Sequence, residues 1–404
     1  MVQTFTAGLP GDELRSDLRA IYTPGKSPLA IDIHSKVKAM FGESLRRQAE
    51  AVCKDLHIEK GSLVLEDFGA LPFVVAARIE AVLKEAHPSL VNEHLPHLEK
   101  GCAYSSRRDR LRRSRLYIPG NQPKLMVNAG VHRPDGIILD MEDSVAPPEK
   151  IATRYLVRNA LRTLDFLGAE RMVRINQGKL GLDDLRYVVP HNVHLILIPK
   201  VEDRWQVEAV DACIAEIAKE CGRKEPVYLM PIIESAKGIL RALEIAESSP
   251  NIVALTIGLE DYTADIGTER SEDGRESFLA RSMIVTAARA AGVQAIDTVY
   301  GDVANTEGLI ASVLEAKSLG FDGKGCIHPR QIQPIHNSFA PTDREIEKAK
   351  KVILAFDDAL AKGLGVVSLG SKMIDPPVVK RAQHTIEMAV AAGVLSQDWK
   401  DQTP

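Results

Sequence analysis

Short apolar runs alternate with amphipathic stretches over most of the chain from residue 114 onward. Eight of these runs have the length and the branched side chains that are typical of buried parallel strands. They are Arg115–Ile118, Gly136–Leu139, Met172–Ile175, Val193–Ile198, Val227–Ile233, Ile252–Ile257, Val293–Ile296 and Gly323–Ile327. Helical patterns separate the runs, and eight such units are the number that closes a parallel barrel. The sequence therefore predicts an α/β protein built on a (β/α)8, or TIM, barrel.

The runs at Val227–Ile233 and Ile252–Ile257 both end in acidic residues, Glu234 after the first and Asp261 after the second. Catalytic groups in such barrels lie beyond the carboxyl ends of the strands. Because Glu234 and Asp261 are one βα unit apart, we expect them to lie close together and to share a hard cation such as Mg²⁺. A single strand-end acid more often caps the next helix or faces solvent.

Polar residues follow nearly all the other predicted strands. They include Pro119-Gly120-Asn121, Asp140-Met141-Glu142-Asp143, Arg174, Asn176, Lys200, Asp297-Thr298 and His328. A barrel that serves only as a scaffold does not need ionisable groups along this edge, so the upper rim is predicted to be an active site. Arg174 can act in this active site, form an ion pair with Glu142 or Asp143, or do both. His328 is more easily explained as a hydrogen-bonding residue of a strand-end turn than as a base.

The first 88 residues carry a separate pattern. Strands are predicted at Leu29–Ile33, Ser62–Glu66 and Phe73–Ala77, and helices at Ser35–Leu56 and Arg78–His87, with Ser35 as a helix cap. This pattern describes a small α+β unit. The chain is thus divided into an N-terminal domain (1–88), a linker (89–113), the barrel (114–335) and a C-terminal helical lid segment (336–404).

Composition narrows the class of protein. The 51 basic and 55 acidic residues give a net charge of -4, so bulk charge gives no indication of nucleic-acid or membrane binding. No apolar run approaches the roughly 20 residues that cross a bilayer. The five cysteines lack metal-ligand spacing, and we expect reduced thiols in a cytoplasmic protein.

The linker carries a basic cluster formed by Arg107, Arg108, Arg110, Arg112 and Arg113. Such a cluster is usually solvated, and contact with an anionic ligand is the less expected alternative.

The segment from Ser114 onward contains the stretches SRLYIPGN, GIILDMEDSVAPPEK, VRIN, LIPKVE, IIESAKG, GLEDYTADIG, AIDTVYGD, GFDGKGCIHPRQI and GSKMIDPPVVKRA. In this order they resemble the beta chain of citrate lyase and its relatives, the malyl- and citramalyl-coenzyme A lyases of the HpcH/HpaI aldolase superfamily. The resemblance implies reversible carbon–carbon cleavage of a 3-hydroxyacyl thioester, which yields a 2-oxo acid and an acyl thioester.

The same resemblance implies roles at the reacting centre. Glu234 and Asp261 match the Mg²⁺ ligands, and Arg174 matches the arginine that stabilises the thioester enolate. Glu142 is placed among the catalytic residues, near the metal, where it would orient the groups around it together with Asp140 and Asp143.

Further roles concern the edges of the site. Asp375 matches an aspartate that reaches the site from a neighbouring subunit and acts as general acid or base, which implies a homotrimer or hexamer. Arg115, Lys124 and Arg330 are the candidates for holding the nucleotide of a coenzyme A thioester.

The N-terminal segment resembles the acyl carrier chain of citrate lyase. The matching residues are Phe41, Gly42, Asp67, Gly69, Ala70, Leu71 and Arg78. In that family a serine in a Ser-x-Asp setting carries a phosphoribosyl-dephospho-coenzyme A arm. Here Ser16 lies at the corresponding place but is followed directly by Asp17, so an ordinary exposed serine is an equal alternative.

Three functions therefore stay open. The first is a citrate-lyase-type enzyme that cleaves a citryl-type thioester to oxaloacetate and an acetyl thioester. The second is a malyl- or citramalyl-coenzyme A lyase with a non-carrying N-terminal domain. The third is a subunit that docks an acyl-transferase partner and uses its barrel as a scaffold, which the intact set Arg174, Glu234, Asp261 and Asp375 argues against.

Overall fold

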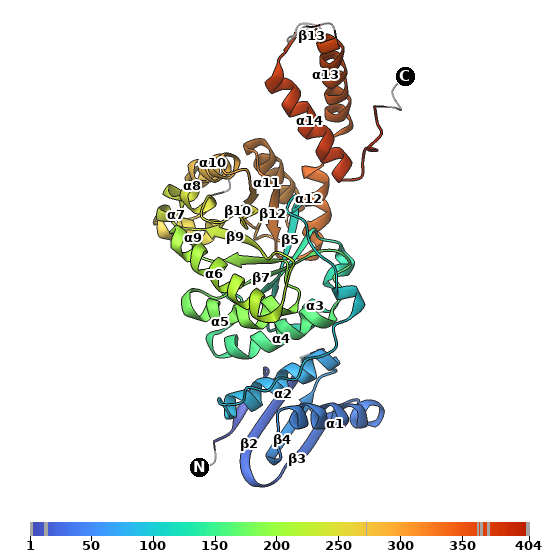
Figure 1. Ribbon diagram of the computed structural model, residues 1–404, viewed down its shortest axis with the longest axis vertical. Coiled ribbons are helices and arrows are strands. Elements are labelled where there is room, and N and C mark those ends of the chain that lie inside the picture. The colour runs from blue at the N-terminus through green and yellow to red at the C-terminus, as the bar shows by residue number, and fades with distance from the viewer. Residues whose placement is uncertain are drawn as a thin grey trace.

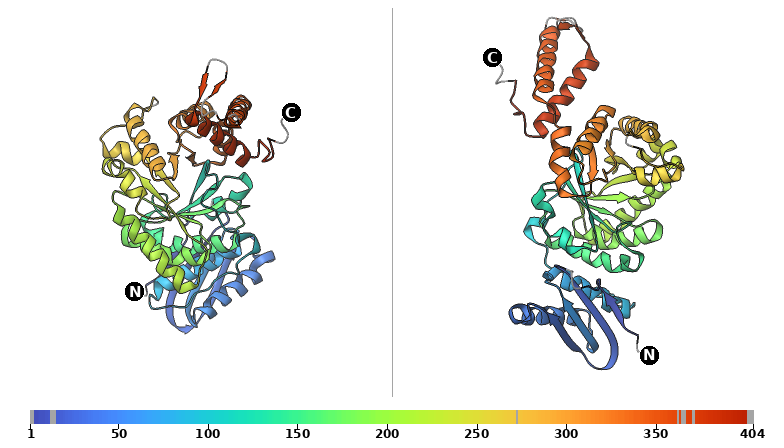
Figure 2. Two further views of the ribbon diagram at one scale, coloured as in Figure 1. Left: turned by 45° about the horizontal axis from the view of Figure 1, so that its top comes forward. Right: turned by 180° about the vertical axis from the view of Figure 1, so that it is seen from behind.

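The computed structural model describes residues 3–11, 15–271, 273–361, 363, 367–369 and 372–400. Three parts follow one another along its longest dimension (Figure 1): an N-terminal α+β domain, a barrel and a pair of C-terminal helices. The barrel lies in the middle, and the two smaller parts project from opposite ends of it in every view (Figure 2).

The barrel consists of eight parallel strands. They are β5 (Ser114–Pro119), β6 (Gly136–Asp140), β7 (Glu170–Arg174), β8 (Leu195–Ile198), β9 (Tyr228–Ile233), β10 (Ala254–Ile257), β11 (Gln294–Asp297) and β12 (Gly323–Cys326). The strands are joined in chain order, and β12 pairs with β5 to close the sheet. The predicted TIM barrel is confirmed, and each predicted run overlaps one of these strands.

Alternation along the strands produces two apolar layers. In β6, Ile138 faces the barrel interior, where it joins Met172, Leu197 and Ile296, whereas its neighbours belong to the layer between strands and helices. Both layers are fully buried, which explains why the strands read as continuous apolar runs.

Ten helices accompany the strands within the described part of the barrel. They are α3 (Pro123–Met126), α4 (Lys150–Thr163), α5 (Gly178–Val188), α6 (Arg204–Cys221), α7 (Ala236–Leu240), α8 (Ala242–Ala246), α9 (Leu259–Asp265), α10 (Arg275–Ala290), α11 (Thr306–Leu319) and α12 (Ile332–Phe339). Short 3₁₀ turns are η1 (Lys100–Cys102), η2 (Ala129–His132), η3 (Pro147–Glu149), η4 (Val189–His191) and η5 (Pro329–Gln331). The segment between β9 and β10 forms two short helices, α7 and α8, which are divided at Arg241.

The N-terminal domain is a mixed four-stranded sheet in the order β1-β2-β4-β3 covered by two helices. Its elements are β1 (Phe5–Ala7), β2 (Leu18–Pro28), β3 (Ala30–Ser35), α1 (Lys38–Asp55), β4 (Lys60–Asp67) and α2 (Pro72–Ala86). The sequence patterns predicted β3, α1 and β4 but did not indicate β1 and β2.

Two predictions in this domain are wrong. Phe73–Ala77 is the first part of α2 rather than a strand, because α2 is buried on all sides between the sheet and α4, and such a helix has no polar face to reveal its period. Ser35 does not cap α1, which begins at Lys38. Its hydroxyl instead donates a hydrogen bond to Asp67 across the sheet, at 2.7 Å.

The basic cluster of the linker is also not solvated as expected. Arg112 is fully buried in an ion pair with Glu170, at 2.7 Å, and Arg113 pairs with Asp135. Arg108 and Arg110 donate hydrogen bonds to backbone carbonyl groups of the barrel. Arg107 and Arg108 are exposed to solvent, and the Arg107 side chain is 82% exposed. These arginines attach the linker to the amino-terminal end of the barrel.

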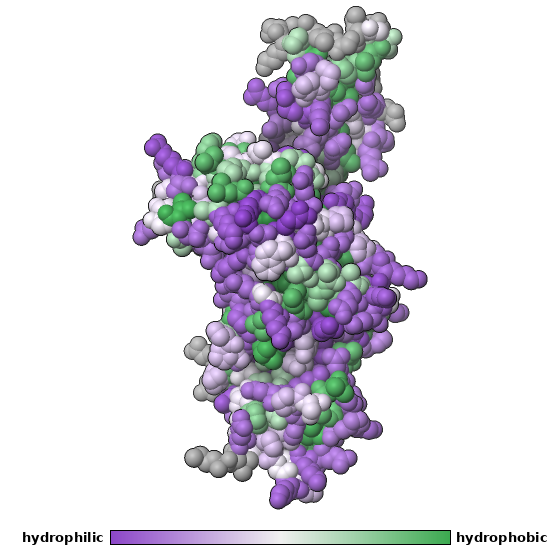
Figure 3. All heavy atoms as spheres, turned by 60° about the vertical axis from the view of Figure 1, so that its left-hand side comes forward, coloured by the Kyte–Doolittle hydropathy of each residue, from purple (hydrophilic) through white to green (hydrophobic). Residues whose placement is uncertain are grey.

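The C-terminal part contains α13 (Asp343–Ala361), the short hairpin β13 (Val367–Leu369) and β14 (Lys372–Ile374), and α14 (Pro376–Ala391). The two helices form a small core of their own, separate from that of the barrel. Among the described residues, no helix is both long enough and apolar enough to cross a bilayer. The face shown in Figure 3 is largely hydrophilic, with a group of apolar side chains over α7–α10. The exposed large apolar residues of these helices include Leu240, Leu243, Phe278 and Leu279.

Candidate active site

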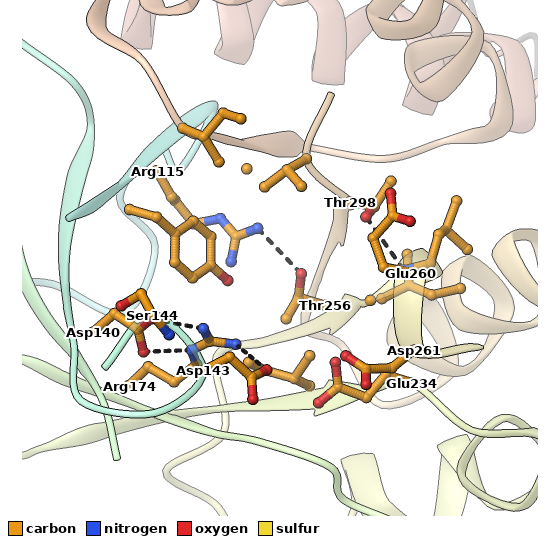
Figure 4. Close-up of a pocket in the computed structure, with 18 of the residues that line it drawn as sticks. Arg115, Asp140, Asp143, Ser144, Arg174, Glu234, Thr256, Glu260, Asp261 and Thr298 are labelled. Atoms are coloured by element: carbon orange, nitrogen blue, oxygen red, sulfur yellow. Dashed lines mark hydrogen bonds and ion pairs between the residues drawn. The ribbon is translucent and has the colours of Figure 1, made fainter. Parts of the chain in front are cut away.

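A pocket of about 380 Å³ opens at the carboxyl ends of the barrel strands. Strands β5 to β7 and β9 to β12, or the residues that follow them, supply its walls (Figure 4). The pocket lies at the rim where the sequence placed the active site, and Arg174, Glu234 and Asp261 all line it.

Glu234 and Asp261 lie side by side in this pocket (Figure 4). Glu234 is only 6% exposed, and burial, followed by the charge of Asp261, raises its pKa to about 8. The Lys200 N–H donates to its Oε1 at 2.8 Å. A Cβ atom on residue 258 would collide with the Glu234 carboxylate, so Gly258 leaves the space that this carboxylate occupies.

The acid pair fits a divalent cation. Two neighbouring carboxylates repel each other unless a proton or a cation is shared between them, and this repulsion adds to the effect of burial in raising the pKa of Glu234. No group of three or more candidate ligands surrounds a common point in the described part of the chain. This donor set suits Mg²⁺, which is often held by one or two carboxylates and completes its octahedron with water and substrate oxygens.

Arg174 is fixed at the end of β7 by carboxylates. Its Nε and Nη2 each donate to Asp140 at 2.7 Å, and its Nη1 lies 3.2 Å from Glu142. Burial alone would raise the pKa of Asp140, but the hydrogen bonds and charge of Arg174 lower it below its usual value. Because Asp140 holds two of its nitrogens, the guanidinium is a permanently charged group of fixed orientation in the pocket wall.

Glu142 lies beneath the rim, 2% exposed, and accepts a hydrogen bond from Gln177 at 2.7 Å. Burial, followed by the neighbouring Asp143 carboxyl group, raises its pKa. Glu142 contacts Arg174 and does not itself line the pocket, which places it behind the reacting groups.

Lys200 is a site residue to which the sequence assigned no role. Its Nζ lies 3.4 Å from Asp261, 3.6 Å from Asp143 and 3.8 Å from Glu142. Burial would lower its pKa, but these carboxylates raise it. The motif LIPKVE places a lysine at a strand end, but its partners come from two other βα loops, so the sequence did not show the cluster.

The candidates for nucleotide binding are separated by the fold. Arg115 was expected at the edge of the barrel, but it is 1% exposed and lies at the floor of the pocket. Lys124 on α3 and Arg330 on η5 are exposed and lie outside the pocket lining. They follow the adjacent strands β5 and β12, so they share one side of the rim.

Three further predicted residues lie away from the pocket in this single chain. Asp375 caps α14 by accepting a hydrogen bond from the Val378 N–H at 3.1 Å, and no described C-terminal residue lines the pocket. His328 accepts a hydrogen bond from the Arg330 N–H, as expected of a turn residue. Ser16 is half-buried in the N-terminal domain with φ 58°, and its N–H donates to the Phe68 carbonyl at 3.0 Å.

Comparison with known proteins gives matches over two separate segments of the chain. The family profile HpcH/HpaI aldolase/citrate lyase matches residues 113–329, and an ACP profile, malonate decarboxylase delta subunit (MdcD), matches residues 9–86. Citrate lyase subunit beta of Haemophilus influenzae is 43% identical over 283 residues, which cover 69% of this chain and 97% of that protein. Mitochondrial citramalyl-CoA lyase of Rattus norvegicus is 31% identical over 335 residues, which cover 80% and 95%.

Solved structures of related proteins also match this chain. Protein CitE from Mycobacterium tuberculosis, in complex with magnesium, acetoacetate and coenzyme A, has a TM-score of 0.58 and 30% identity, with 71% of this chain and 100% of that chain covered. A citrate lyase from Burkholderia xenovorans, at 21% identity and a TM-score of 0.64 over 76% of this chain and 100% of that chain, shares the fold. Because its relatives include citrate lyase beta subunits and a citramalyl-CoA lyase, the chain is a carbon–carbon lyase. More narrowly, it belongs to the HpcH/HpaI aldolase/citrate lyase family and carries an acyl-carrier-like domain at its N-terminus.

Proposed function

We propose that the chain is a Mg²⁺-dependent lyase that cleaves a citryl-type 3-hydroxyacyl thioester to oxaloacetate and an acetyl thioester. The observation that carries the proposal is the convergence of a fixed arginine, Arg174, with the acid pair Glu234 and Asp261 in one pocket. Among its relatives, the citrate lyase beta subunits support the substrate, and the CitE complex with magnesium and coenzyme A supports the metal and the thioester.

In the proposed reaction, the acid pair and Arg174 act on different parts of the substrate. Glu234 and Asp261 would hold the cation, which, when bound, supplies Lewis-acid polarisation of the substrate's hydroxyl and carboxylate oxygens. Cleavage removes the hydroxyl proton, and the carbinol C–O bond becomes the C=O bond of the oxo acid. The electron pair of the breaking carbon–carbon bond moves onto the carbon next to the thioester carbonyl, which gives the thioester enolate. Arg174 stabilises that developing negative charge, because its orientation is set by Asp140 before the substrate binds. Protonation of the enolate carbon gives the acetyl thioester.

The general acid or base is proposed to be Asp375 of a neighbouring subunit, with Glu142 orienting Arg174 from behind. We also propose that Lys124 and Arg330 contact the nucleotide end of the thioester, since both lie exposed on one side of the rim. The proposed assembly is a homotrimer or hexamer in the cytoplasm. An acyl-transferase subunit is its proposed partner if the N-terminal domain carries an arm.

Turnover of citryl-coenzyme A tests the proposal. Purified protein with Mg²⁺ is expected to release oxaloacetate, detected by its reduction with malate dehydrogenase and NADH. Excess chelator is expected to stop the release, and added Mg²⁺ to restore it. Full activity in excess chelator would refute the metal assignment, and cleavage of neither citryl- nor citramalyl-coenzyme A would refute the reaction.

A second candidate, a lyase of free coenzyme A esters with a non-carrying N-terminal domain, is favoured by one observation. Asp17, next to Ser16, is buried and held by Arg78, whose Nε and Nη2 donate to it at 3.1 and 2.9 Å. The same guanidinium donates to the Asn121 carbonyl at 3.1 Å and lies 3.7 Å from Glu149, both on the barrel. The segment around Ser16 is therefore tied to the barrel rather than presented on a free domain.

Intact mass of the protein purified from its native host separates the two candidates. An added mass that maps to Ser16 supports the carrier-dependent enzyme. An unmodified chain that cleaves the free ester supports the second candidate.

A further inference from the structure

A buried arginine that pairs with no carboxylate of the described residues lies at the floor of the pocket. Arg115 extends from β5 into the barrel interior, where it is 1% exposed (Figure 4). Its Nη2 donates to Thr256 Oγ1 at 3.1 Å and its Nη1 to the Met230 sulfur at 2.8 Å. Its Nε has no hydrogen-bond partner in the described part of the chain. Both acceptors are neutral, and a thioether is a weak acceptor.

Other buried arginines of this protein are satisfied differently. Arg112 faces Glu170, and Arg158 faces Glu80. The Nε of Arg171 also lacks a partner, but its Nη1 and Nη2 donate to backbone carbonyls at the end of α4, where the helix dipole is negative. Arg115 has neither kind of acceptor, and a buried charge without a counterion is costly. Burial lowers its pKa accordingly.

Three of the acids that line the pocket, Asp140, Asp143 and Asp297, are already engaged by other cations, and Glu234 and Asp261 form the proposed cation site. Asp297 is the acid of the neighbouring strand, but its carboxylate is held by Lys324 at 2.7 Å and by Arg281 at 3.1 Å. Asp140 and Asp143 face Arg174, on the other side of Tyr117. The missing counterion of Arg115 must therefore come from the pocket itself, that is, from a bound anion.

We propose that Arg115, together with Thr256, binds the second carboxylate of the oxo acid part of the substrate. The proposal rests on the lyase function proposed above and specifies its substrate class: an oxo acid with two carboxylates, as in oxaloacetate, rather than one, as in pyruvate. A guanidinium can donate two parallel hydrogen bonds to a carboxylate, and the Thr256 hydroxyl can add a third. A site built around such groups discriminates against the analogue that lacks the partner, because the buried donors then stay unpaired. Arg115 thus acts at the reacting end of the substrate rather than at the nucleotide of coenzyme A.

Calorimetric titration of oxaloacetate and of pyruvate, each with Mg²⁺, measures the preference directly. In the wild type, oxaloacetate is expected to bind about 10- to 100-fold more tightly than pyruvate, the range of a buried hydrogen bond to a charged group. Arg115→Met should remove that advantage and leave pyruvate affinity within about twofold. Arg115→Lys, which keeps the charge, should retain part of it, and Thr256→Val should lower it less than Arg115→Met.

Arg270→Met is the matched control. Arg270 carries a positive charge beside the same pocket, where it pairs with Glu260 at 2.6 Å and donates to the Val299 carbonyl. Its replacement should leave the preference unchanged, because its charge is already neutralised by Glu260. With thioester substrates, Arg115→Met should lower kcat/KM for citryl-coenzyme A and spare citramalyl-coenzyme A, whereas a merely structural role would lower both alike.

The outcomes separate this inference from the function on which it rests. Equal binding of the two acids by the wild type would overturn the role of Arg115, even if no variant folds. A loss that Arg115→Met imposes equally on both acids would also overturn it. If neither acid binds with Mg²⁺ and neither thioester is cleaved, the proposed lyase function fails first.

Discussion

The Arg158 guanidinium group of the barrel lies 2.5 Å from the Glu80 carboxylate of the N-terminal domain, and neither side chain is exposed to solvent. Glu80 projects from α2 and Arg158 from α4, the two helices that form the junction. Asn159, the next residue on α4, donates to the Phe73 carbonyl at 3.1 Å. The carrier-like domain is therefore held to the barrel by buried polar contacts as well as by apolar packing.

Removing one member of this pair should destabilise the whole chain. Glu80→Ala leaves the Arg158 charge without its buried partner, although Glu93 lies 3.2 Å away. We expect the free energy of unfolding, measured in urea, to be about 3–5 kcal/mol lower than that of the wild type. Replacing both residues, in Glu80→Leu with Arg158→Met, should cost less than Glu80→Ala alone. Glu220→Ala, which breaks an exposed pair with Arg186, is the control and should leave the midpoint unchanged. Two separate unfolding transitions in the wild type would contradict the coupling.

The fold could be predicted where one-dimensional patterns decide the structure. Eight apolar runs with helical spacers were sufficient for the barrel, because parallel strands covered on both faces have few polar positions. Patterns failed where tertiary packing decides. The segment Phe73–Ala77 was mistaken for a strand because α2 is buried on two faces, and β2 was missed because its second half, up to Pro28, is exposed and polar.

The acid pair leads to a prediction about metal binding. Glu234→Gln keeps the shape of the side chain but removes the charge, so Mg²⁺ affinity should fall at least about tenfold and turnover should be lost. The metal-free variant should melt no lower than the metal-free wild type, because the raised pKa of Glu234 means that its ionised form is unfavourable in the fold. Calorimetric Mg²⁺ titration and thermal unfolding check both statements. Glu260→Gln, a neighbour paired with Arg270, is the control. Unchanged Mg²⁺ affinity in Glu234→Gln would show that the cation binds elsewhere.

Arg174→Lys tests the enolate role. A lysine keeps the positive charge but cannot reproduce the two parallel hydrogen bonds to Asp140, so its charge is less precisely placed. We expect kcat to fall about 10²- to 10³-fold, with a much smaller change in KM, since the interaction is strongest in the transition state. Arg186→Lys on the exposed face of α5 should leave both constants unchanged. A large rise in KM with normal kcat would assign Arg174 to substrate binding instead.

The site could be predicted only in part, because tertiary packing decides which side chains meet there. Glu234, Asp261 and Arg174 were found because each lies at the end of a strand or within a few residues after it, and barrel topology brings strand ends together. Lys200 received no role because its three carboxylate partners belong to other loops. Arg115 was misplaced because alternation in β5 directs it inward, where it lies against Met230 and Thr256, and the motif SRLYIPG does not reveal that direction.

His194 should make the protein sensitive to acid. Burial lowers its pKa from 6.5 to about 3, and its ring accepts from the Arg171 N–H while its Nε2 contacts the Tyr104 carbonyl at 2.7 Å. That arrangement suits the neutral ring. Below pH 6.5 the unfolded chain binds a proton that the folded chain does not, so stability is full above pH 6.5 and is lost as the pH falls toward 3. At pH 5 the loss from this one residue is about 2 kcal/mol.

Urea unfolding at pH 7.5 and pH 5 measures this effect as a difference between proteins. His194→Gln keeps hydrogen-bonding groups but cannot be protonated in this range, so its stability should fall less between the two pH values than that of the wild type. His328→Gln, at a residue on the barrel rim, serves as the control and should follow the wild type. Equal losses in the wild type and in His194→Gln would exclude His194 as the source of acid sensitivity.

The position of Asp375 leads to a prediction about shared active sites. Asp375 lies at the start of α14, outside the pocket lining of its own chain, while Glu234 lies inside it. If Asp375 acts in the barrel of a neighbouring chain, Asp375→Asn inactivates the pocket of that neighbour, whereas Glu234→Gln inactivates the pocket of its own chain. Each variant alone should be inactive. Asparagine preserves the helix cap, so loss of activity in Asp375→Asn would not reflect unfolding of α14.

Co-expression of the two inactive chains decides the matter. In a mixed trimer, a barrel with intact Glu234 next to a chain with intact Asp375 forms one complete site, so random mixing should restore roughly a quarter of wild-type turnover. Co-expression of Glu234→Gln with Asp261→Asn is the control, because both substitutions damage the same barrel pocket and no complete site can form. Restored activity in the first mixture and none in the second would establish that Asp375 acts across subunits. No restoration in either mixture, with mixed oligomers present by mass, would place the action of Asp375 within its own chain.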